Sequence, residues 1–324
     1  MNLVQLAGCL QGVGLTSFKT NHDHRVQAVK SSVTQPDKPC LLIIDGHHFA
    51  YRSFYAIRSM AAPDGFPTNA IYGFIKMMNR MRNQVKPTHI AVIWDGGLDE
   101  ERTETLEEYK GQRDPMPDDM EVQLDAIDEW LEAVGIFSWC EDNVEADDVI
   151  GTLAWQAEAA GHFVVVASAD KDFFQLINED IHMLNPNDKS DMLWGALQIE
   201  NKTGVAPEQI VDWLSLVGDT VDGIPGVTGV GPKTAAKLLT QYKTVEVLYE
   251  RIDTISSPKL RERLSAAEKD VRRNRQLIAL KIIRQWDVSL DTLRPATPDV
   301  SRLREQYRRW DFRSLLQSLD EFQF

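Results

Sequence analysis

Carboxylates gather at a few short stretches of this sequence, and their spacing gives the first indication of chemistry. The stretch NVEADDVIGTLAWQ, residues 143–156, holds Glu145, Asp147 and Asp148 just before an apolar run with helical spacing. Acids in the first turn of a helix are common, because they face the positive end of its dipole. Taken alone, this stretch indicates only the start of a helix.

The same arrangement recurs at the ends of other expected elements. The carboxylates in such positions are Asp45, Asp95, Glu145, Asp147, Asp148, Asp170, Asp172, Asp219 and Asp222. Packed together without cations they would repel one another, and several would be forced to take up a proton. Hard cations such as Mg²⁺ bind carboxylate oxygens, and a pair of them about 4 Å apart can activate water and stabilise the leaving oxygen of a phosphodiester. We therefore expect a metal site here rather than scattered helix caps.

The elements that must position these acids follow from hydrophobic patterning. Between residues 39 and 185, short apolar runs alternate with segments of helical period. Three β-rich runs, CLLIID (40–45), HIAVIWD (89–95) and HFVVVASAD (162–170), predict parallel strands covered on both faces. Helices are expected at 49–60, 69–84, 118–134 and 145–160. The sequence thus predicts an α/β fold, and the acids at the strand ends should converge at one edge of the sheet.

Past residue 205 the pattern changes to short helices without strands, broken by GDTVDGIPGVTGVGPKTA at 218–235. This stretch nearly matches a phosphate loop, but Pro232 separates Gly231 from Lys233 and no buried strand comes before it, so we do not expect ATP binding. It fits a helix, a tight glycine hairpin and a second helix that Pro232 starts. The hairpin amides and lysines can hold a phosphate backbone without reading bases, although a plain helix–helix turn is the alternative.

Composition bounds the class of protein. The chain has 324 residues, of which 43% are hydrophobic and 26% charged, enough for one large core or two domains. No run approaches the ~20 apolar residues of a membrane span. Cys9, Cys40 and Cys140 lie far apart, which argues against a disulfide framework and a zinc site. We expect a cytoplasmic protein.

Charge is unevenly distributed along the chain. The net charge of −14 would ordinarily argue against nucleic acid as a partner. The window from Pro232 to Arg284, however, carries 13 Lys and Arg against 6 Asp and Glu, so it is +7 and the remainder is −21. The helical region is therefore the candidate nucleic-acid surface.

Residues 1–38 are polar, lack sustained periodicity and are expected to form a flexible extension. The motif LAGC ending at Cys9 superficially matches a lipoprotein cleavage site. A basic region is absent and the apolar stretch before it is too short, so we do not expect lipidation.

Five blocks of the sequence, in order, resemble a known family. They are IIDGHHFAYRSFYAI, YKGQRDPMPDDM, EADDVIGTLA, SADKDFFQL and GDTVDGIPGVTGVGPKTAAKLL, within about residues 40–320. The blocks are similar to those of the 5′ nuclease superfamily, which includes the 5′→3′ exonuclease domain of bacterial DNA polymerase I and the flap endonucleases. The resemblance implies a PIN-like nuclease core joined to a helix-three-turn-helix DNA-binding region. The nine carboxylates above fall on positions similar to the acids of the family's metal site.

The resemblance also implies roles for basic and hairpin residues. Arg52, Lys110 and Arg113 match residues that engage DNA near the scissile phosphate and are expected to be catalytic. Lys110 and Arg113 lie in residues 99–118, which resemble the family's arch. The pattern predicts residues 99–117 as an exposed loop or frayed helix. The expected DNA-binding residues of the hairpin are Gly226, Gly229, Gly231, Lys233, Thr234 and Lys237.

The implied organisation is an extension (1–38), a nuclease core (39–205) that includes the arch (99–118), the DNA-binding region (206–290) and a C-terminal helical segment (291–324). The expected cofactors are two or more Mg²⁺ ions, with Mn²⁺ as a substitute, and K⁺ at the hairpin. The expected partners are 5′ flaps, nicked or branched duplexes and RNA–DNA primer ends, with a DNA polymerase acting in trans and no membrane. Because the chain stops at Phe324, we expect a free-standing nuclease. The terminal QSLDEFQF, with Gln317, Leu319 and Phe322, is only weakly similar to a sliding-clamp-binding peptide.

Departures from the family pattern are few, and they leave alternatives open. In GDTVDG, Val221 stands where the family usually has a small polar residue, and Gly223 stands where it usually has Asn. Residues 101–118 hold six acids against three bases, so this arch would thread DNA less tightly. A silent DNA-binding module would have lost several acids, and an RNA-directed PIN-like nuclease would have no reason to carry the hairpin. A dehalogenase-like phosphatase would need an acid where the chain has His47, which with His48 is interpreted as a packing or polar loop residue.

Overall fold

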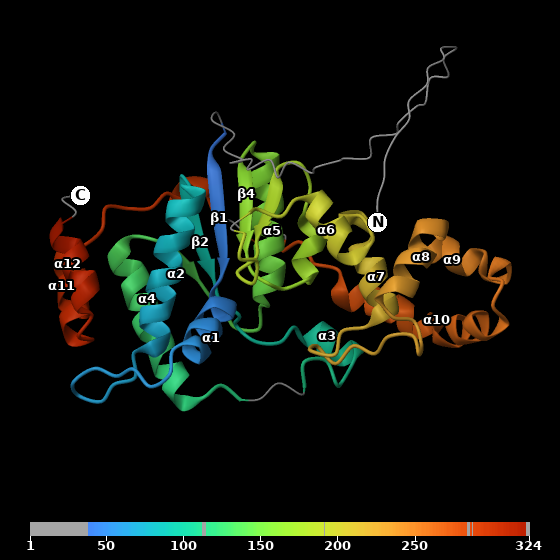
Figure 1. Cartoon of the computed structure of the whole chain (residues 1–324), viewed down its shortest axis with the longest axis horizontal. Coiled ribbons are helices and arrows are strands. Elements are labelled where there is room, and N and C mark those ends of the chain that lie inside the picture. The colour runs from blue at the N-terminus through green and yellow to red at the C-terminus, as the bar shows by residue number, and fades with distance from the viewer. Residues whose placement is uncertain (1–37, 112–114, 191, 284–285, 287, 322–324) are drawn as a thin grey trace, which may run out of the picture. The chain divides into compact units, whose positions relative to one another are not determined.

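The computed structural model describes residues 38–111, 115–190, 192–283, 286 and 288–321. Five parallel strands form one sheet in the order β3-β2-β1-β4-β5. Figure 1 shows β1 between β2 and β4. The strands are β1 Cys40–Asp45, β2 His89–Ile93, β3 Phe137–Trp139, β4 Phe163–Ala167 and β5 Ile181–Leu184. The predicted α/β class is confirmed, and the three predicted strands are β1, β2 and β4.

Helices cover both faces of the sheet. The helices of the core are α1 Gly46–Ala56, α2 Asn69–Val85, α3 Glu100–Thr105, α4 Asp118–Val134, α5 Ala146–Ala159 and α6 Ala196–Thr203. Strand β1 alternates between two buried clusters: Leu42 and Ile44 pack with α1, α2 and α4, whereas Leu41 and Ile43 pack with α5. Because side chains on successive residues of a strand point to opposite faces, this alternation requires cover on both sides.

The predicted helices are found with small shifts. Helix α1 begins at Gly46 rather than near residue 49, because the Asp45 carboxylate accepts a hydrogen bond from the His48 amide and caps the helix three residues earlier. Strands β3 and β5 were not predicted. They have three and four residues, too few for a period to be recognised.

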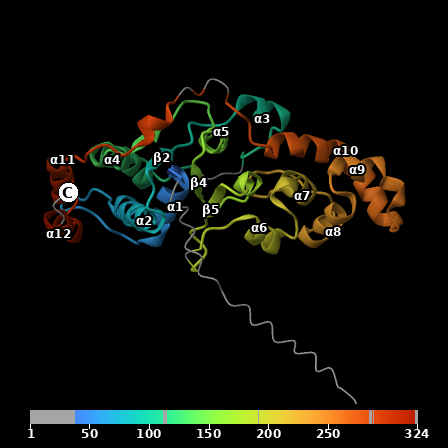
Figure 2. The ribbon, with the colours of Figure 1, turned by 90° about the horizontal axis from the view of Figure 1, so that it is seen from above.

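The chain beyond residue 205 is helical, as predicted. Its helices are α7 Ile210–Val217, α8 Pro232–Tyr242, α9 Val245–Glu250, α10 Pro258–Ile278, α11 Val300–Arg309 and α12 Arg313–Glu321. Helices α7 to α10 share a buried cluster with the α5 face of the sheet, while α11 and α12 pack with α2 and α4 on the other face (Figures 1 and 2). In the described part of the chain, no helix is long and apolar enough to cross a membrane.

Residues 99–111 differ in part from the prediction of an exposed loop or frayed helix. They form α3 and a set of turns, and α3 lies beside α10 (Figure 2). Arg102, Leu106, Tyr109 and Lys110 are buried. The prediction is wrong for these residues because two of them are bases whose charges face buried acids, a contact that periodicity does not reveal.

Candidate active site

The strand-end acids do lie at the carboxyl edge of the sheet. Asp45 is the last residue of β1, Asp95 lies two positions beyond β2, and Asp170 lies three beyond β4. Ser168 joins two of them: its hydroxyl donates to Asp45 Oδ2 at 2.9 Å and accepts from the Asp170 amide at 3.1 Å. The sheet and one serine therefore fix the centre of the site.

Asp172 follows at the start of a 3₁₀ turn, Asp172–Leu176. Its backbone amide donates to Asp170 Oδ1 at 2.9 Å. Its side chain is buried, and Oδ1 has no hydrogen-bond partner. A buried carboxylate oxygen without a donor is costly, so this atom has a lone pair available for a cation.

The acids of α5 have a different environment, because Arg102 of α3 reaches them. Its guanidinium donates to Asp148 Oδ2 at 2.7 Å and Oδ1 at 2.9 Å, and to Glu145 Oε2 at 3.0 Å. The Lys281 amide also donates to Asp148 Oδ1, at 2.8 Å. The side chains of Arg102, Glu145 and Asp148 are 5% exposed or less, so this is a buried, bidentate ion pair.

Lys110 is held in the same cluster. Its Nζ lies 2.8 Å from Glu145 Oε2 and 3.6 Å from Asp147 Oδ2, and the Tyr109 hydroxyl donates to Glu145 Oε2 at 3.1 Å. The Lys110 amide donates to Asp222 O at 3.0 Å. We call residues 99–111 the arch base. It docks directly on the predicted metal acids.

Asp219 and Asp222 lie in the turn after α7, where an isolated antiparallel bridge pairs Asp219 with Ile224. Asp219 Oδ2 forms an ion pair with Lys171 Nζ at 2.8 Å, and its Oδ1 accepts from the Val221 amide at 2.9 Å. Gly223 has φ +70°, and a Cβ there would lie 2.6 Å from Glu108 O. Glycine in this position therefore permits the close approach of the arch base.

The electrostatics separate the acids into two groups. Although burial favours the neutral form, Lys110 and Arg102 lower the pKa of Glu145. Burial raises the pKa of Asp45 to about 6, helped by the charges of Asp170 and Asp95.

Burial and the charge of Asp170 also raise the pKa of Asp172 well above its usual range, and Asp147, Asp222 and Asp219 add to this shift. Burial likewise raises the pKa of Asp147, with Asp170 and Asp45 contributing against Lys110. Lys110 and Arg102 thus favour the charged form of Glu145, whereas burial and neighbouring carboxylates favour the neutral forms of Asp45, Asp147, Asp170 and Asp172.

The donors fit a hard divalent cation. They are carboxylates, one of which has a buried oxygen without a partner, and their mutual repulsion is the conflict that a bound cation removes. In the described ranges, no three His, Cys, Asp or Glu side chains already converge as ligands.

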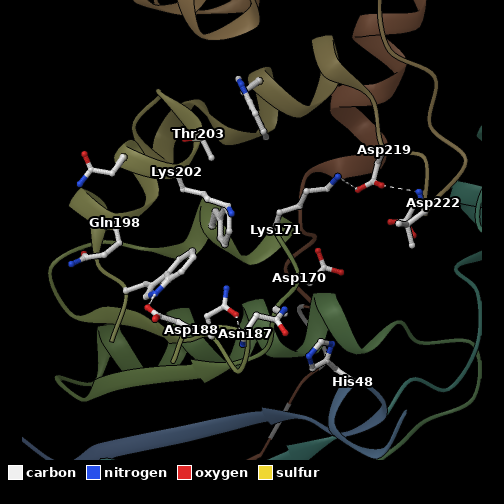
Figure 3. A pocket seen from close by; sticks show the side chains of 17 residues that line it. His48, Asp170, Lys171, Asn187, Asp188, Gln198, Lys202, Thr203, Asp219 and Asp222 are labelled. Atoms are coloured by element: carbon white, nitrogen blue, oxygen red, sulfur yellow. Dashed lines mark hydrogen bonds and ion pairs between the residues drawn. The ribbon is translucent and has the colours of Figure 1, made fainter. Parts of the chain in front are cut away.

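A cleft of about 890 Å³ opens beside the acids. Asp170, Asp219 and Asp222 line one side, and Gln198 and Lys202 of α6 line the other (Figure 3). His48 lines it from α1, and burial lowers the pKa of this imidazole to about 4, so it is neutral at physiological pH. His47, also on α1, accepts a hydrogen bond from the Asp95 amide at 3.0 Å through Nδ1.

The predicted basic residues differ in their placement. Arg52 donates to Asn187 Oδ1 at 2.7 Å and Pro186 O at 2.9 Å, so it holds the loop after β5. Lys110 is buried among the acids. Arg113 lies outside the described residues. Catalytic roles for these three residues stay predictions.

The glycine hairpin has the predicted form. Helix α7 ends at Val217, and α8 begins with Pro232 at its first position. A Cβ on Gly226 would lie 2.0 Å from Val217 O, and Gly229 has φ +77°.

Gly226, Gly229, Lys233 and Lys237 are exposed, so backbone and charge face solvent together. Gly231, also exposed, caps α8, and Thr234 lies half-buried in its first turn.

Several residues that shape the site were missed. Arg102 stands in the sequence only as one base of an acidic segment, and no motif marks Tyr109. Ser168 and Lys171 lie within two residues of Asp170, and this proximity is the local signal for them. The pairing of Arg102 with acids some 43 to 46 positions away leaves no local signal.

Comparison with solved structures shows the same fold. The bacteriophage T5 5′-exonuclease with bound zinc matches 87% of this chain and 98% of its own, with TM-score 0.63 and 19% identity. The catalytic core of Rad2 in complex with a DNA substrate matches 86% of this chain and 92% of its own, with TM-score 0.58 and 16% identity.

Comparison with curated sequences gives closer relatives. A 5′-3′ exonuclease of Aquifex aeolicus (strain VF5) is 35% identical over 281 residues, which is 87% of this chain and 95% of the relative. DNA polymerase I of Bacillus subtilis (strain 168) is 36% identical over 87% of this chain, which spans only 32% of that polymerase. Family models for the 5′-3′ exonuclease N-terminal resolvase-like domain and C-terminal SAM fold match residues 40–204 and 205–301. With its strand-end acids, arch base and glycine hairpin, this chain belongs to the 5′-3′ exonuclease family.

Proposed function

We propose that the protein is a metal-dependent, structure-specific 5′→3′ exonuclease and 5′ flap endonuclease that hydrolyses DNA phosphodiester bonds. The observation that carries this proposal is the connected set of buried carboxylates at the sheet edge, in a chain of this family. The mutual repulsion of Asp170, Asp172 and Asp147 has no evident purpose without cations.

Two divalent ions, Mg²⁺ or in its place Mn²⁺, would supply the charge that activates water and stabilises the leaving oxygen. Asp45, Asp170 and Asp172 would hold them first, because burial and neighbouring carboxylates raise the pKa values of these three acids. Asp95, Asp147, Asp219 and Asp222 complete the set. Glu145 and Asp148 orient the arch base through Arg102 and Lys110. Lys110 thereby brings a fixed positive charge to the place where the phosphate must lie.

The hairpin and the basic helices would hold the duplex behind the cleavage site. Exposed Gly229, Lys233 and Lys237 offer amides and ammonium groups, which suit phosphates and not bases. K⁺ at the hairpin carbonyls is part of this proposal. Arg113 of the arch would engage the 5′ single strand.

The substrates would be 5′ flaps, nicked or branched duplexes and RNA–DNA primer ends in the cytoplasm, with a DNA polymerase supplied in trans. A sliding clamp is not proposed as a partner. Leu319, which the weak motif would present to a clamp, is buried on α12, and Phe322 lies outside the described residues.

Purified protein should be assayed on 5′-flap, nicked, blunt and single-stranded DNA, each with Mg²⁺, with Mn²⁺ and with a chelator. We expect flap and nick cleavage that requires metal. Asp170→Asn should abolish it, whereas Asp180→Asn, at the opposite end of the sheet, should not. Cleavage in chelator would contradict the metal mechanism. Preference for RNA would favour the PIN-like alternative, and tight DNA binding without cleavage would favour the silent module.

A further inference from the structure

The cleft beside the acids continues well beyond them. Its far side is lined by Trp194, Gln198, Asn201 and Lys202, none of which belongs to the predicted catalytic set. Figure 3 shows Gln198 and Lys202 on α6, across the cleft from Asp219 and Asp222. At about 890 Å³ the cleft lies in the upper part of the range of ligand sites, ~300–1,000 Å³. The acids occupy only one end of it.

The far side is held in place by several contacts. Trp194 Nε1 donates to Asp188 Oδ2 at 2.6 Å, and the Trp194 backbone exchanges two hydrogen bonds with Met183 of β5. The Trp194 ring also lies 6.0 Å from that of Phe174. Arg52 fixes the adjoining loop through Asn187 and Pro186. A half-buried tryptophan is thus oriented before any ligand arrives.

A lysine and two side-chain amides lie on the same side of the cleft as the Trp194 ring. Asp188 holds that ring, because its carboxylate accepts from both Trp194 Nε1 and the Ser190 amide. Lys202 is exposed in the last turn of α6, and Asn201 and Gln198 add amides. An aromatic face beside a lysine and amides is the combination that binds single-stranded nucleic acid.

We propose that the far side of this cleft binds the single-stranded stretch of the substrate next to the scissile bond, with a base against Trp194 and a phosphate at Lys202. This inference rests on the proposed function, because the acids at the near end define which bond is cut. It assigns the substrate a path along α6, separate from the glycine hairpin that would hold the duplex.

The test uses a 5′-flap DNA with the fluorescent base 2-aminopurine placed in turn on each side of the scissile bond, in Ca²⁺ in place of Mg²⁺. The wild type should quench the fluorescence at one of the positions by stacking, and Trp194→Leu should not. Trp194→Phe keeps a ring and should retain most of the quenching. Lys202→Ala should weaken binding roughly 3- to 10-fold and reduce the salt slope by about one ion.

Lys76→Ala provides the matched control, since Lys76 is an exposed helical lysine of α2. The inference is overturned if Lys202→Ala binds as Lys76→Ala does, or if a folded Trp194→Leu still quenches. Because Lys202 is exposed, its substitution still tests the inference even if Trp194→Leu does not fold. Cleavage of the same flap by the wild type in Mg²⁺ tests the proposed function separately.

Discussion

Two groups of carboxylates, both among the acids predicted to bind metal, differ completely in their partners. Glu145 and Asp148 on α5 form the clamped pair, enclosed by Arg102, Lys110 and a tyrosine hydroxyl. Asp45, Asp170 and Asp172 form the open group. In the part of the chain that the structure describes, no Lys or Arg lies within ion-pair distance of the open group.

The difference teaches that a carboxylate motif does not define one function. The clamped pair has its hydrogen-bond and ion-pair partners within the protein, so it binds the arch base to α5. Burial and mutual repulsion raise the pKa values of the open group, which we propose as the group that binds the metal ions. In that proposal, acids of the same motif type serve as anchors or as ligands, depending on their contacts with distant segments.

Removing the guanidinium of Arg102, which pairs with both acids of the clamped pair, should give the largest change in the free energy of unfolding. Arg102→Met leaves Glu145 and Asp148 buried without most of their compensation, which should lower the free energy of unfolding by about 3–5 kcal/mol. Urea denaturation measures this change. Arg302→Met, which breaks an ion pair with the exposed Glu132, should change the free energy of unfolding far less, because exposed ion pairs are screened by solvent. Similar losses of stability in the two variants would mean that the buried ion pairs of Arg102 stabilise the protein no more than an exposed ion pair does.

Replacing an aspartate by asparagine should lower the stability of the metal-free protein in the clamped pair and raise it in the open group. Asp148→Asn removes the charge that balances Arg102 and should destabilise the metal-free protein by roughly 3 kcal/mol. Asp172→Asn removes a repelling charge and should stabilise it by on the order of 1 kcal/mol. Both are measured by urea denaturation in chelator. If both variants lose stability equally, the distinction between the groups is wrong.

The fold was largely predictable because it depends on local pattern. The apolar runs of β1, β2 and β4 and the periods of α2, α4 and α5 match the expected elements closely. The edge strands β3 and β5 were not predictable, since so few residues carry no period. These two strands form because the backbones of β2 and β4 offer them hydrogen-bond partners.

The site was predictable in its acids but not in its cations. Strand-end position identified Asp45 and Asp170, because parallel strands bring their carboxyl ends together. The burial of Arg102 and Lys110 depends on contacts across the fold, and a charged segment without an apolar face is normally exposed. Nothing in the sequence near Arg102 indicates that its charge is buried.

Protonation should distinguish the groups by pH. The folded pKa of Asp45 is about 6 against 3.8 for the ordinary group, so the folded state binds its proton more tightly. Stability of the metal-free protein is therefore lost as pH rises from about 4 to about 6. Asp45→Asn should become progressively more stable than the wild type over this window. Thermal unfolding in chelator measures this difference in stability. A difference between Asp45→Asn and the wild type that does not change with pH would contradict this account.

The smallest change in stability should come from Lys281, a partly exposed residue beside the clamped pair. Its ammonium lies 2.9 Å from Asp99 Oδ2 and 2.7 Å from Glu101 Oε2, and its side chain is 33% exposed. Its backbone amide, which donates to Asp148, survives substitution. Lys281→Ala should therefore lower stability by only about 0.5–1 kcal/mol, because exposed ion pairs are screened. Hydrogen exchange should nevertheless quicken in the arch base (99–111), whose first turn loses its anchor, and Lys281→Arg should restore it. Unchanged exchange in Lys281→Ala would show that Arg102 and Lys110 alone hold the arch base on the acids.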